Sequence, residues 1–167
     1  MKTYKFSTQL TVMDMFRFQM RHTYICVSGF IAVLVSLLCL VILWLNHDDY
    51  VFTTNGLLVF GGALFTVIQP FMLLKRSFKI IALTPTFKEP LNYELDEEGV
   101  HVSQNGETAD LNWDMVVKVI ETKTTLCIYS SPKNAFILPV KQLGEEYGQI
   151  KEFVKGNVKD YAVVRVK

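Results

Sequence analysis

Cysteine and histidine are the residue types of this chain best suited to nucleophilic or metal chemistry, but their spacing predicts neither kind of site. Cys26 and Cys39 share one apolar segment and would lie about 20 Å apart along a helix. Cys127 lies much later, in a segment with strand periodicity. The histidines fall in three different segments, as His22, His47 and His101. The sequence therefore predicts no disulfide framework and no metal site.

One nucleophile and base pair remains conceivable, because Cys127 and His101 could lie on neighbouring strands. A small thiol in an apolar strand is more often a core residue, and we favour that interpretation. The acidic runs 96–98 and 145–146 fit a turn and a helix start, where carboxylates complement the helix dipole. The glycines form no phosphate-binding motif. We expect no enzymatic activity and no cofactor.

The composition favours a folded membrane protein. Half of the 167 residues are apolar and 20% are charged. Aromatic residues make up 13% of the chain, which is unlike a disordered polypeptide. The formal net charge of +1 lacks the basic excess typical of nucleic-acid binders, so no nucleic-acid partner is expected.

Two long segments without a charged residue cover 24–45 and 51–74. As helices they would be roughly 33 to 36 Å long, enough to cross a hydrocarbon core of about 30 Å. The first begins too late and is too long for a cleaved signal peptide. We therefore predict a transmembrane helical hairpin over residues 24–75 with a short connector at 46–50. Neither span contains an ionisable Asp, Glu, Lys, Arg or His, which disfavours ion transport.

Basic residues flank the predicted hairpin on one side of the membrane. The flanking set is Arg17, Arg21, Lys75, Arg76 and Lys79. The connector 46–50 contains neither Lys nor Arg, so the positive-inside rule places both termini in the cytoplasm. Membrane lipids are the expected contacts of these flanking residues.

Small residues recur on one stripe of each predicted span and would let the two helices approach closely. The stripe comprises Ser28, Ala32 and Ser36 in the first helix and Gly62 and Thr66 in the second. Packing within the hairpin is the favoured interpretation, and homodimerisation through the same stripe is the alternative. Gln69 and Pro70 lie near the cytoplasmic end of the second helix, where a kink and a polar side chain are tolerable if a neighbouring segment satisfies the freed backbone groups.

Residues 1–23 are expected to form a strand and an interfacial helix. Polar and apolar residues alternate over 4–10, and Thr11 with Asp14 resembles a capping box at the start of the helix. Arg17 and Arg21 would then reach lipid headgroups, although simple positive-inside flanks explain the same residues equally well. We predict that the strand joins the cytoplasmic sheet, because both lie on one side of the membrane.

Short alternating segments separated by turn residues fill residues 80–167 and predict an antiparallel β domain. The expected strands cover 91–95, 100–102, 108–113, 115–122, 126–130 and 135–140. Asn105–Gly106 predicts a hairpin turn, and an apolar stripe over 143–154 predicts a helix ending at Gly156–Asn157. A strand meander plugged by a helix is built like a pleckstrin-homology-like domain. The predicted fold class is membrane α+β, a two-helix hairpin followed by this domain.

Four segments of the domain carry a family resemblance. They are 95–100, 113–122, 126–129 and 135–139, and residues 10–18 extend the match to nearly the whole chain. Together they resemble the YcxB-like family of bacterial membrane proteins. The resemblance implies two transmembrane helices before a pleckstrin-homology-like cytoplasmic domain, and it implies no established activity. Where the family often has a basic residue after Ile-Leu-Pro, this chain has Val140 and then Lys141.

We predict a membrane-anchored cytoplasmic interaction or regulatory module that is not an enzyme, with a protein partner or a second copy of the chain. Specific phosphoinositide binding is not expected, because residues 80–167 hold ten basic and thirteen acidic residues and the loop after the first domain strand is acidic. Trp113 is expected in the core rather than at a partner surface. An alternative function is self-protection, as an immunity protein against a membrane-active toxin.

Overall fold

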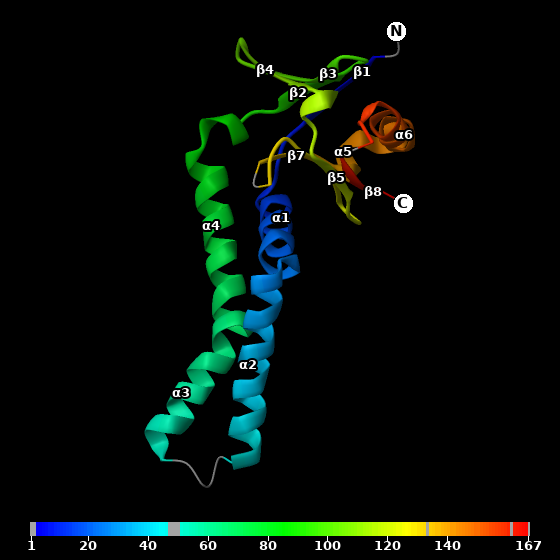
Figure 1. The fold of residues 1–167 in the computed structure, drawn as a ribbon. Coiled ribbons are helices and arrows are strands. Elements are labelled where there is room, and N and C mark those ends of the chain that lie inside the picture. The colour runs from blue at the N-terminus through cyan, green and yellow to red at the C-terminus, as the bar shows by residue number, and fades with distance from the viewer. Residues whose placement is uncertain (1–2, 47–50, 133, 161, 167) are drawn as a thin grey trace. The chain divides into compact units, whose positions relative to one another are not determined.

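The computed structural model describes residues 3–46, 51–132, 134–160 and 162–166 (Figure 1). The predicted connector at 47–50 and Lys133 of a predicted turn lie outside the described residues. The chain divides into two compact units. Residues 15–80 form the helical unit, and residues 1–14 and 81–167 form the β unit.

The helical unit contains two long apolar helices. The elements in chain order are α1 (Val12–Ile25), α2 (Val27–Asn46), α3 (Phe52–Ala63), a π-helix (Leu64–Ile68) and α4 (Gln69–Leu83). By length and composition, Val27–Asn46 and the continuous run Phe52–Leu83 are each able to cross a membrane. The first apolar helix starts at Val27 rather than at the expected residue 24, and the second continues past residue 74.

A local turn at Cys26 separates α1 from α2. The Cys26 thiol donates to the Thr23 carbonyl at 3.0 Å, and its sulfur accepts from the Gly29 N–H at 3.3 Å. A Cβ atom on Gly29 would lie only 1.9 Å from that carbonyl oxygen, so the turn requires glycine at this position. These contacts explain why the charge-free segment is not one helix from its first residue.

The π-helix lies immediately before Pro70 and widens the helix at the predicted kink. The Gln69 N–H donates to the Leu64 carbonyl, five residues earlier. The next such bond would join residue 70 to the Phe65 carbonyl, but proline has no N–H. The Tyr24 hydroxyl instead donates to the Phe65 carbonyl at 2.6 Å. Tyr24 of α1 thus supplies a donor to a carbonyl that Pro70 cannot bind.

The β unit begins with a four-stranded antiparallel sheet, called the first sheet here. Its strands are β1 (Tyr4–Thr8), β2 (Leu91–Leu95), β3 (Gly99–Gln104) and β4 (Glu107–Asn112), in that spatial order. Tyr4 pairs with Leu95 and Thr8 with Leu91. The N-terminal strand therefore joins the domain sheet, as predicted. In the chain, the whole helical unit separates β1 from β2, although these two strands are hydrogen-bonded neighbours in the sheet.

The second sheet has the spatial order β7-β6-β5-β8. Its strands are β5 (Lys118–Glu121), β6 (Thr125–Tyr129), β7 (Ala135–Pro139) and β8 (Val163–Arg165). β5, β6 and β7 pair antiparallel, whereas β8 pairs parallel to β5. The expected single meander is thus divided into two sheets, and β8 was not predicted. The expected strand 115–122 is shorter, because Trp113–Met115 forms a 3₁₀ turn.

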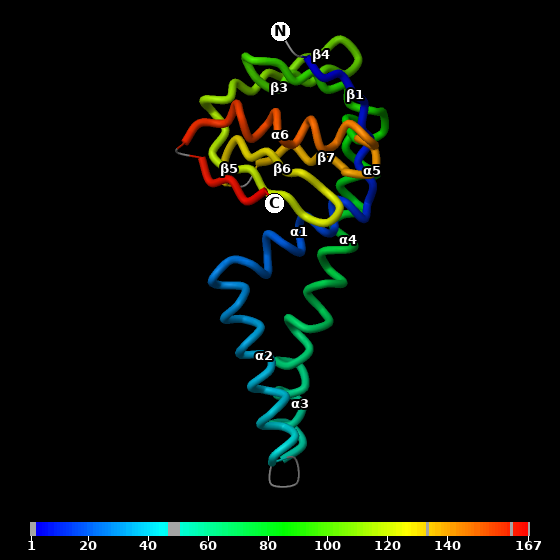
Figure 2. The backbone as a smooth tube through the Cα atoms, turned by 90° about the vertical axis from the view of Figure 1, so that its right-hand side faces the viewer, coloured from blue at the N-terminus to red at the C-terminus, as the bar shows by residue number. Residues whose placement is uncertain are grey.

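Two helices complete the β unit, α5 (Val140–Leu143) and α6 (Tyr147–Asn157). Figures 1 and 2 place α6 along one open side of the two stacked sheets. Both sheets and α6 share one core, whose completely buried members include Leu95, Val100, Leu126, Ile128, Leu138 and Ile150. The Tyr147 hydroxyl fastens α6 to the second sheet by donating to Glu121 Oε1 at 2.5 Å.

Turn residues confirm one sequence prediction and correct another. Asn105 and Gly106 both have positive φ, at 51° and 85°, and join β3 to β4 as a tight hairpin. The predicted end of the last helix is confirmed, because α6 ends at Asn157, but Gly156 does not adopt the left-handed conformation of a glycine cap. The left-handed glycine is Gly144, with φ 56°, where α5 ends before α6.

Candidate interaction surface

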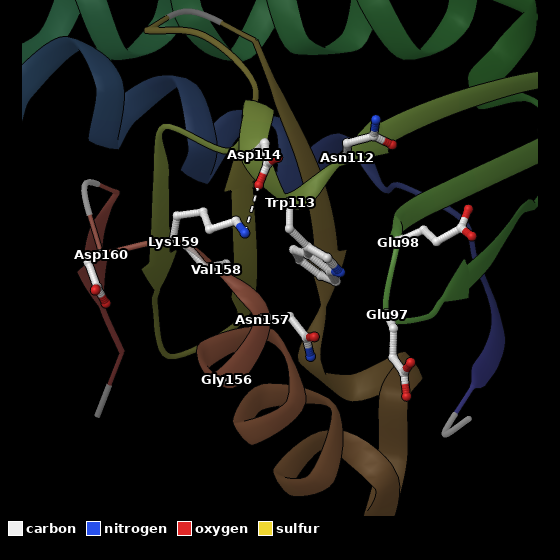
Figure 3. Close-up of a pocket in the computed structure, with 10 residues that line it drawn as sticks. All are labelled: Glu97, Glu98, Asn112, Trp113, Asp114, Gly156, Asn157, Val158, Lys159 and Asp160. Atoms are coloured by element: carbon white, nitrogen blue, oxygen red, sulfur yellow. Dashed lines mark ion pairs between the residues drawn. The ribbon is translucent and has the colours of Figure 1, made fainter.

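An open cleft of about 650 Å³ lies in the β unit where the end of β4 meets the segment after α6 (Figure 3). The hairpin loop between β2 and β3 forms another wall. The lining residues are Glu97, Glu98, Asn112, Trp113, Asp114, Gly156, Asn157, Val158, Lys159 and Asp160. Four of these residues are acidic and one is basic, so the cleft has a negative lining.

Trp113 forms the floor of this cleft and is a core residue. Its side chain is buried, and its indole N–H donates to the Asp96 carbonyl at 2.8 Å. Its ring meets Phe153 of α6 edge-on at a centroid distance of 6.3 Å. Trp113 thereby joins the β2–β3 loop to α6, and its predicted place in the core is confirmed.

Asp96 of the acidic run 96–98 has a structural role, whereas the other two residues are exposed. Asp96 Oδ1 accepts from the Glu98 N–H at 2.8 Å and from the Gly99 N–H at 3.0 Å, which shapes the turn before β3. Burial by itself would raise the pKa of Asp96, but these backbone bonds and the bond to His101 lower it overall. Glu97 and Glu98 are exposed and border the cleft.

Lysine 159 is the basic residue of the cleft, and it pairs with Asp114 across one wall. Its Nζ lies 3.1 Å from Asp114 Oδ1, as the dashed line in Figure 3 marks. Both side chains are more than half exposed, at 54% and 71%, so the pair contributes at most about 1 kcal/mol to stability. The remaining acidic side chains of the lining leave the cleft suited to a cationic segment of a partner.

His101 lies on the first sheet between two carboxylates. Its Nδ1 is 2.6 Å from Asp110 Oδ1 on β4, and its Nε2 is 3.3 Å from Asp96 Oδ1. The bond to Asp110 is the main cause that raises the pKa of His101, and the bond to Asp96 adds to it. These contacts favour the protonated imidazolium, which is a cation and a poor general base.

The structure separates Cys127 from His101. Cys127 is buried on β6 of the second sheet, whereas β3 with His101 belongs to the first sheet. The alternative in which the two residues occupy neighbouring strands is therefore excluded, because their strands belong to different sheets. Among the described residues, no three His, Cys, Asp or Glu side chains are placed to hold a metal ion.

Two of the predicted helix-packing residues, Ser36 and Gly62, lie where α2 meets α3. The buried Ser36 hydroxyl donates to the Gly61 carbonyl at 2.9 Å. A Cβ atom on Gly62 would lie 2.3 Å from Leu40 Cδ2. Ala32 is half-buried, Ser28 is exposed, and exposed Thr66 donates to the carbonyl of Gly62 on its own helix.

Three contacts were not predicted from the sequence: two lie within the β unit and one lies within the helical unit. The Gln9 N–H donates to Gln142 Oε1 at 2.7 Å, and Gln142 Nε2 returns a bond to the Gln9 carbonyl at 2.8 Å. This reciprocal pair fastens the chain after β1 to α5. The contacts of Tyr147 with Glu121 and of Tyr24 with Phe65 were also missed, because no local sequence pattern specifies a partner so distant in the chain.

A family model matches part of the β unit. Residues 95–154 match the family model described as YcxB-like protein, a range that runs from the end of β2 into α6. No curated protein and no solved structure matched the chain. The matched range contains the β2–β3 loop and Trp113–Asp114 of the cleft. The resemblance to the YcxB-like family is therefore confirmed, and the family match lies within the β unit.

Proposed function

We propose that this chain is an interaction module without catalytic activity, anchored in the bacterial inner membrane with its β unit in the cytoplasm. The anchor follows from the order of the elements. β1 and β2 pair with each other, yet the helical unit lies between them in the chain. A segment that leaves one strand and returns to its neighbour has to cross a membrane an even number of times. Two crossings by the two apolar helices meet that requirement.

Charge supports the cytoplasmic orientation. The described part of the helical unit, 15–46 and 51–80, has its basic residues at the end nearest to the β unit in sequence. Arg17 and Arg21 lie on α1, and α4 carries the other three flanking cations. The positive-inside rule then places that end, and both connections to the β unit, on the cytoplasmic side.

A pleckstrin-homology-like fold is the architecture we propose for the β unit. Two stacked sheets with one helix along an open side support this assignment (Figures 1 and 2). The proposal concerns the framework alone, because the acidic β2–β3 loop offers no cluster of donors for a multiply phosphorylated headgroup. We infer a protein as the partner of this unit.

The observation that carries the interaction proposal is the open edge of β4. Among the described residues, β4 pairs with β3 on one side and has no strand on the other. Residues 107–110 are exposed, so the open edge is accessible. An extended segment of a partner can add to such an edge through backbone hydrogen bonds. The strand then leads directly into the negative cleft at Asn112.

Site-specific photo-crosslinking in cells tests this proposal. A crosslinking amino acid replaces Ala109 on β4, and a matched chain carries it at exposed Gln149 on α6. We expect a discrete adduct from position 109 and none from position 149. Mass spectrometry of the adduct then names the partner or identifies a second copy of the chain.

Equal adducts from both positions, or none from position 109, would contradict strand addition at β4. The anchor is tested separately by alkaline extraction and by protease added outside intact spheroplasts. We expect the chain to stay in the membrane and the β unit to be protected. Digestion of the β unit from the outside would overturn the proposed orientation.

A further inference from the structure

Helix α4 carries a face of cations and aromatic rings that the rest of the helical unit leaves uncovered. We call it the α4 cationic face, and it comprises Phe71, Lys75, Arg76, Phe78 and Lys79. The two phenylalanine side chains are 59% and 56% exposed, and the three cations are exposed as well. At 3.6 residues per turn, all five fall within less than half of the helix circumference.

The opposite face of α4 is held against α1, which fixes the direction of the cationic face. Leu73 and Ser77 are buried, with 6% and 0% exposure. Gln19 Nε2 on α1 donates to Ser77 Oγ at 3.0 Å, and the Ser77 hydroxyl donates to the Leu73 carbonyl at 2.9 Å. Because these bonds set the rotation of α4, its cations point away from α1.

Lys75 lies at the transition from the apolar to the charged part of the helix. Its Nζ is 5.3 Å from the centre of the Phe71 ring, one turn nearer to the apolar segment. A side chain on a helix leans toward the N-terminal turn, and here that direction brings the ammonium back over an aromatic ring. An amphipathic arrangement of this kind suits the headgroup layer of a bilayer, where the ring meets apolar material and the ammonium meets phosphate.

The helical unit supplies no carboxylate to neutralise these cations. Its described residues, 15–46 and 51–80, include five Lys and Arg and no Asp or Glu. The five are Arg17, Arg21, Lys75, Arg76 and Lys79. No ion pair among the described residues of the chain involves any of them. No carboxylate of the described helical unit therefore offsets these charges.

We propose that the α4 cationic face is a binding surface for anionic phospholipid headgroups. The charge complementarity and the location of the face within the long helical run Phe52–Leu83, directly after its charge-free segment, favour this occupant over a soluble anion. The inference rests on the proposed membrane insertion and goes beyond it, because insertion alone requires no preference among lipids. Residues 81–167 of the β unit, by contrast, have an acidic excess.

Lipid retention by the purified full-length chain tests the proposal. The chain is reconstituted into nanodiscs that contain equal parts of phosphatidylcholine and phosphatidylglycerol, and the lipids that stay bound after release are counted by native mass spectrometry. We expect phosphatidylglycerol to be enriched at low salt, by about fivefold for each cation engaged. The enrichment should decrease as the salt concentration rises.

Two variants with equal loss of charge locate the effect. In the first, Lys75, Arg76 and Lys79 are all replaced by Gln, and the enrichment should fall at least tenfold. In the matched control, the exposed β-unit residues Lys88, Lys123 and Lys141 become Gln, and the enrichment should persist. Phe71→Leu keeps every charge and should reduce the enrichment less than the triple substitution does.

Equal retention of the two lipids by the wild-type chain would overturn the inference, as would enrichment that survives the triple α4 substitution. In both cases the chain still associates with nanodiscs, so the proposed function stands. Failure of the chain to enter bilayers of either lipid would overturn the membrane anchor and the lipid surface together. The lipid enrichment measured with the wild-type chain tests the inference even if a variant fails to fold.

Discussion

The two units of this chain bury opposite kinds of residues. In the β unit, large aliphatic side chains such as Leu126 and Ile128 are completely buried. In the helical unit, Leu38 and Trp44 are 58% and 79% exposed, whereas Ser36 and Ser77 are buried. In water the hydrophobic effect favours burial of apolar side chains. In lipid they can stay exposed, because the lipid tails are equally apolar. This difference is the one expected if the helical unit lies in a membrane, as we propose, and the β unit lies in water.

Polar groups also have different tasks in the two units. Inside the helical unit, hydroxyls bind backbone carbonyls, as Ser36 binds Gly61 and Tyr24 binds Phe65. In the β unit, side-chain bonds such as that from Trp113 to the Asp96 carbonyl fix loops around an apolar core. Packing of the helices therefore depends on small residues and single hydrogen bonds. The stability of the β unit depends on the volume of its buried apolar side chains.

The largest expected effect comes from the same kind of truncation made in both units. Ile128→Ala removes a completely buried side chain and should destabilise the β unit by about 2–5 kcal/mol. Leu38→Ala removes a side chain that is 58% exposed and should change stability little in detergent. Denaturant unfolding followed by limited proteolysis of the β unit measures both. Equal losses would contradict the division into two kinds of core.

Overpacking should be the next largest effect, and it tests the helical unit. Gly62→Val places atoms where Leu40 now lies and should cost about 1–3 kcal/mol in the α2–α3 contact. Gly56→Val on α3 meets nothing within 4 Å and is the control. Unfolding of the helices by sodium dodecyl sulfate, followed by circular dichroism, compares the two. Matching curves would show that α2 and α3 do not depend on close approach.

A double-mutant cycle should resolve the contact at the π-helix. Tyr24→Phe leaves the Phe65 carbonyl without its hydroxyl donor and should cost about 1 kcal/mol. Pro70→Ala restores a backbone N–H at residue 70, so Tyr24→Phe should cost less in that background. The same detergent unfolding assay measures the four proteins. Strictly additive effects would contradict the compensation of Pro70 by Tyr24.

The smallest expected effect is a pH dependence confined to the β unit. Because Asp110 and Asp96 raise the pKa of His101 in the folded state, its contribution is complete below about pH 6.5 and is lost as pH rises through the folded pKa. For a partly exposed pair the loss should be under about 1 kcal/mol. Thermal unfolding of His101→Gln should lack this loss. His22→Gln on α1 should retain it.

Sequence patterns predicted the elements whose causes are local. The capping box is one case, since Thr11 Oγ1 donates to Asp14 Oδ2 at 2.6 Å and accepts from the Asp14 N–H at 3.2 Å. The Asn105–Gly106 hairpin is another, because both residues tolerate positive φ. The family resemblance also followed from short segments, which the matched range 95–154 includes in large part.

Elements with distant causes were missed. β8 has only three residues, and its strand conformation depends on pairing with β5. The break at Cys26 depends on a thiol and a glycine rather than on hydrophobicity. The cleft was not predicted, because its walls come from the β2–β3 loop, the end of β4 and the segment after α6. Each of these features is specified by tertiary contacts that periodicity does not encode.

The insertion of the helical unit between β1 and β2 also sets an order on synthesis and folding. β1 is made first, but its partner begins only at Leu91, after both apolar helices have been made. The first sheet therefore cannot close while the nascent chain still lacks its second helix. Closing this pairing carries the entropy cost of a long loop unless the hairpin brings its two ends together. Of the strand pairings in the first sheet, the one between β1 and β2 therefore depends on synthesis of the whole helical unit, whereas β2, β3 and β4 follow one another directly in the chain.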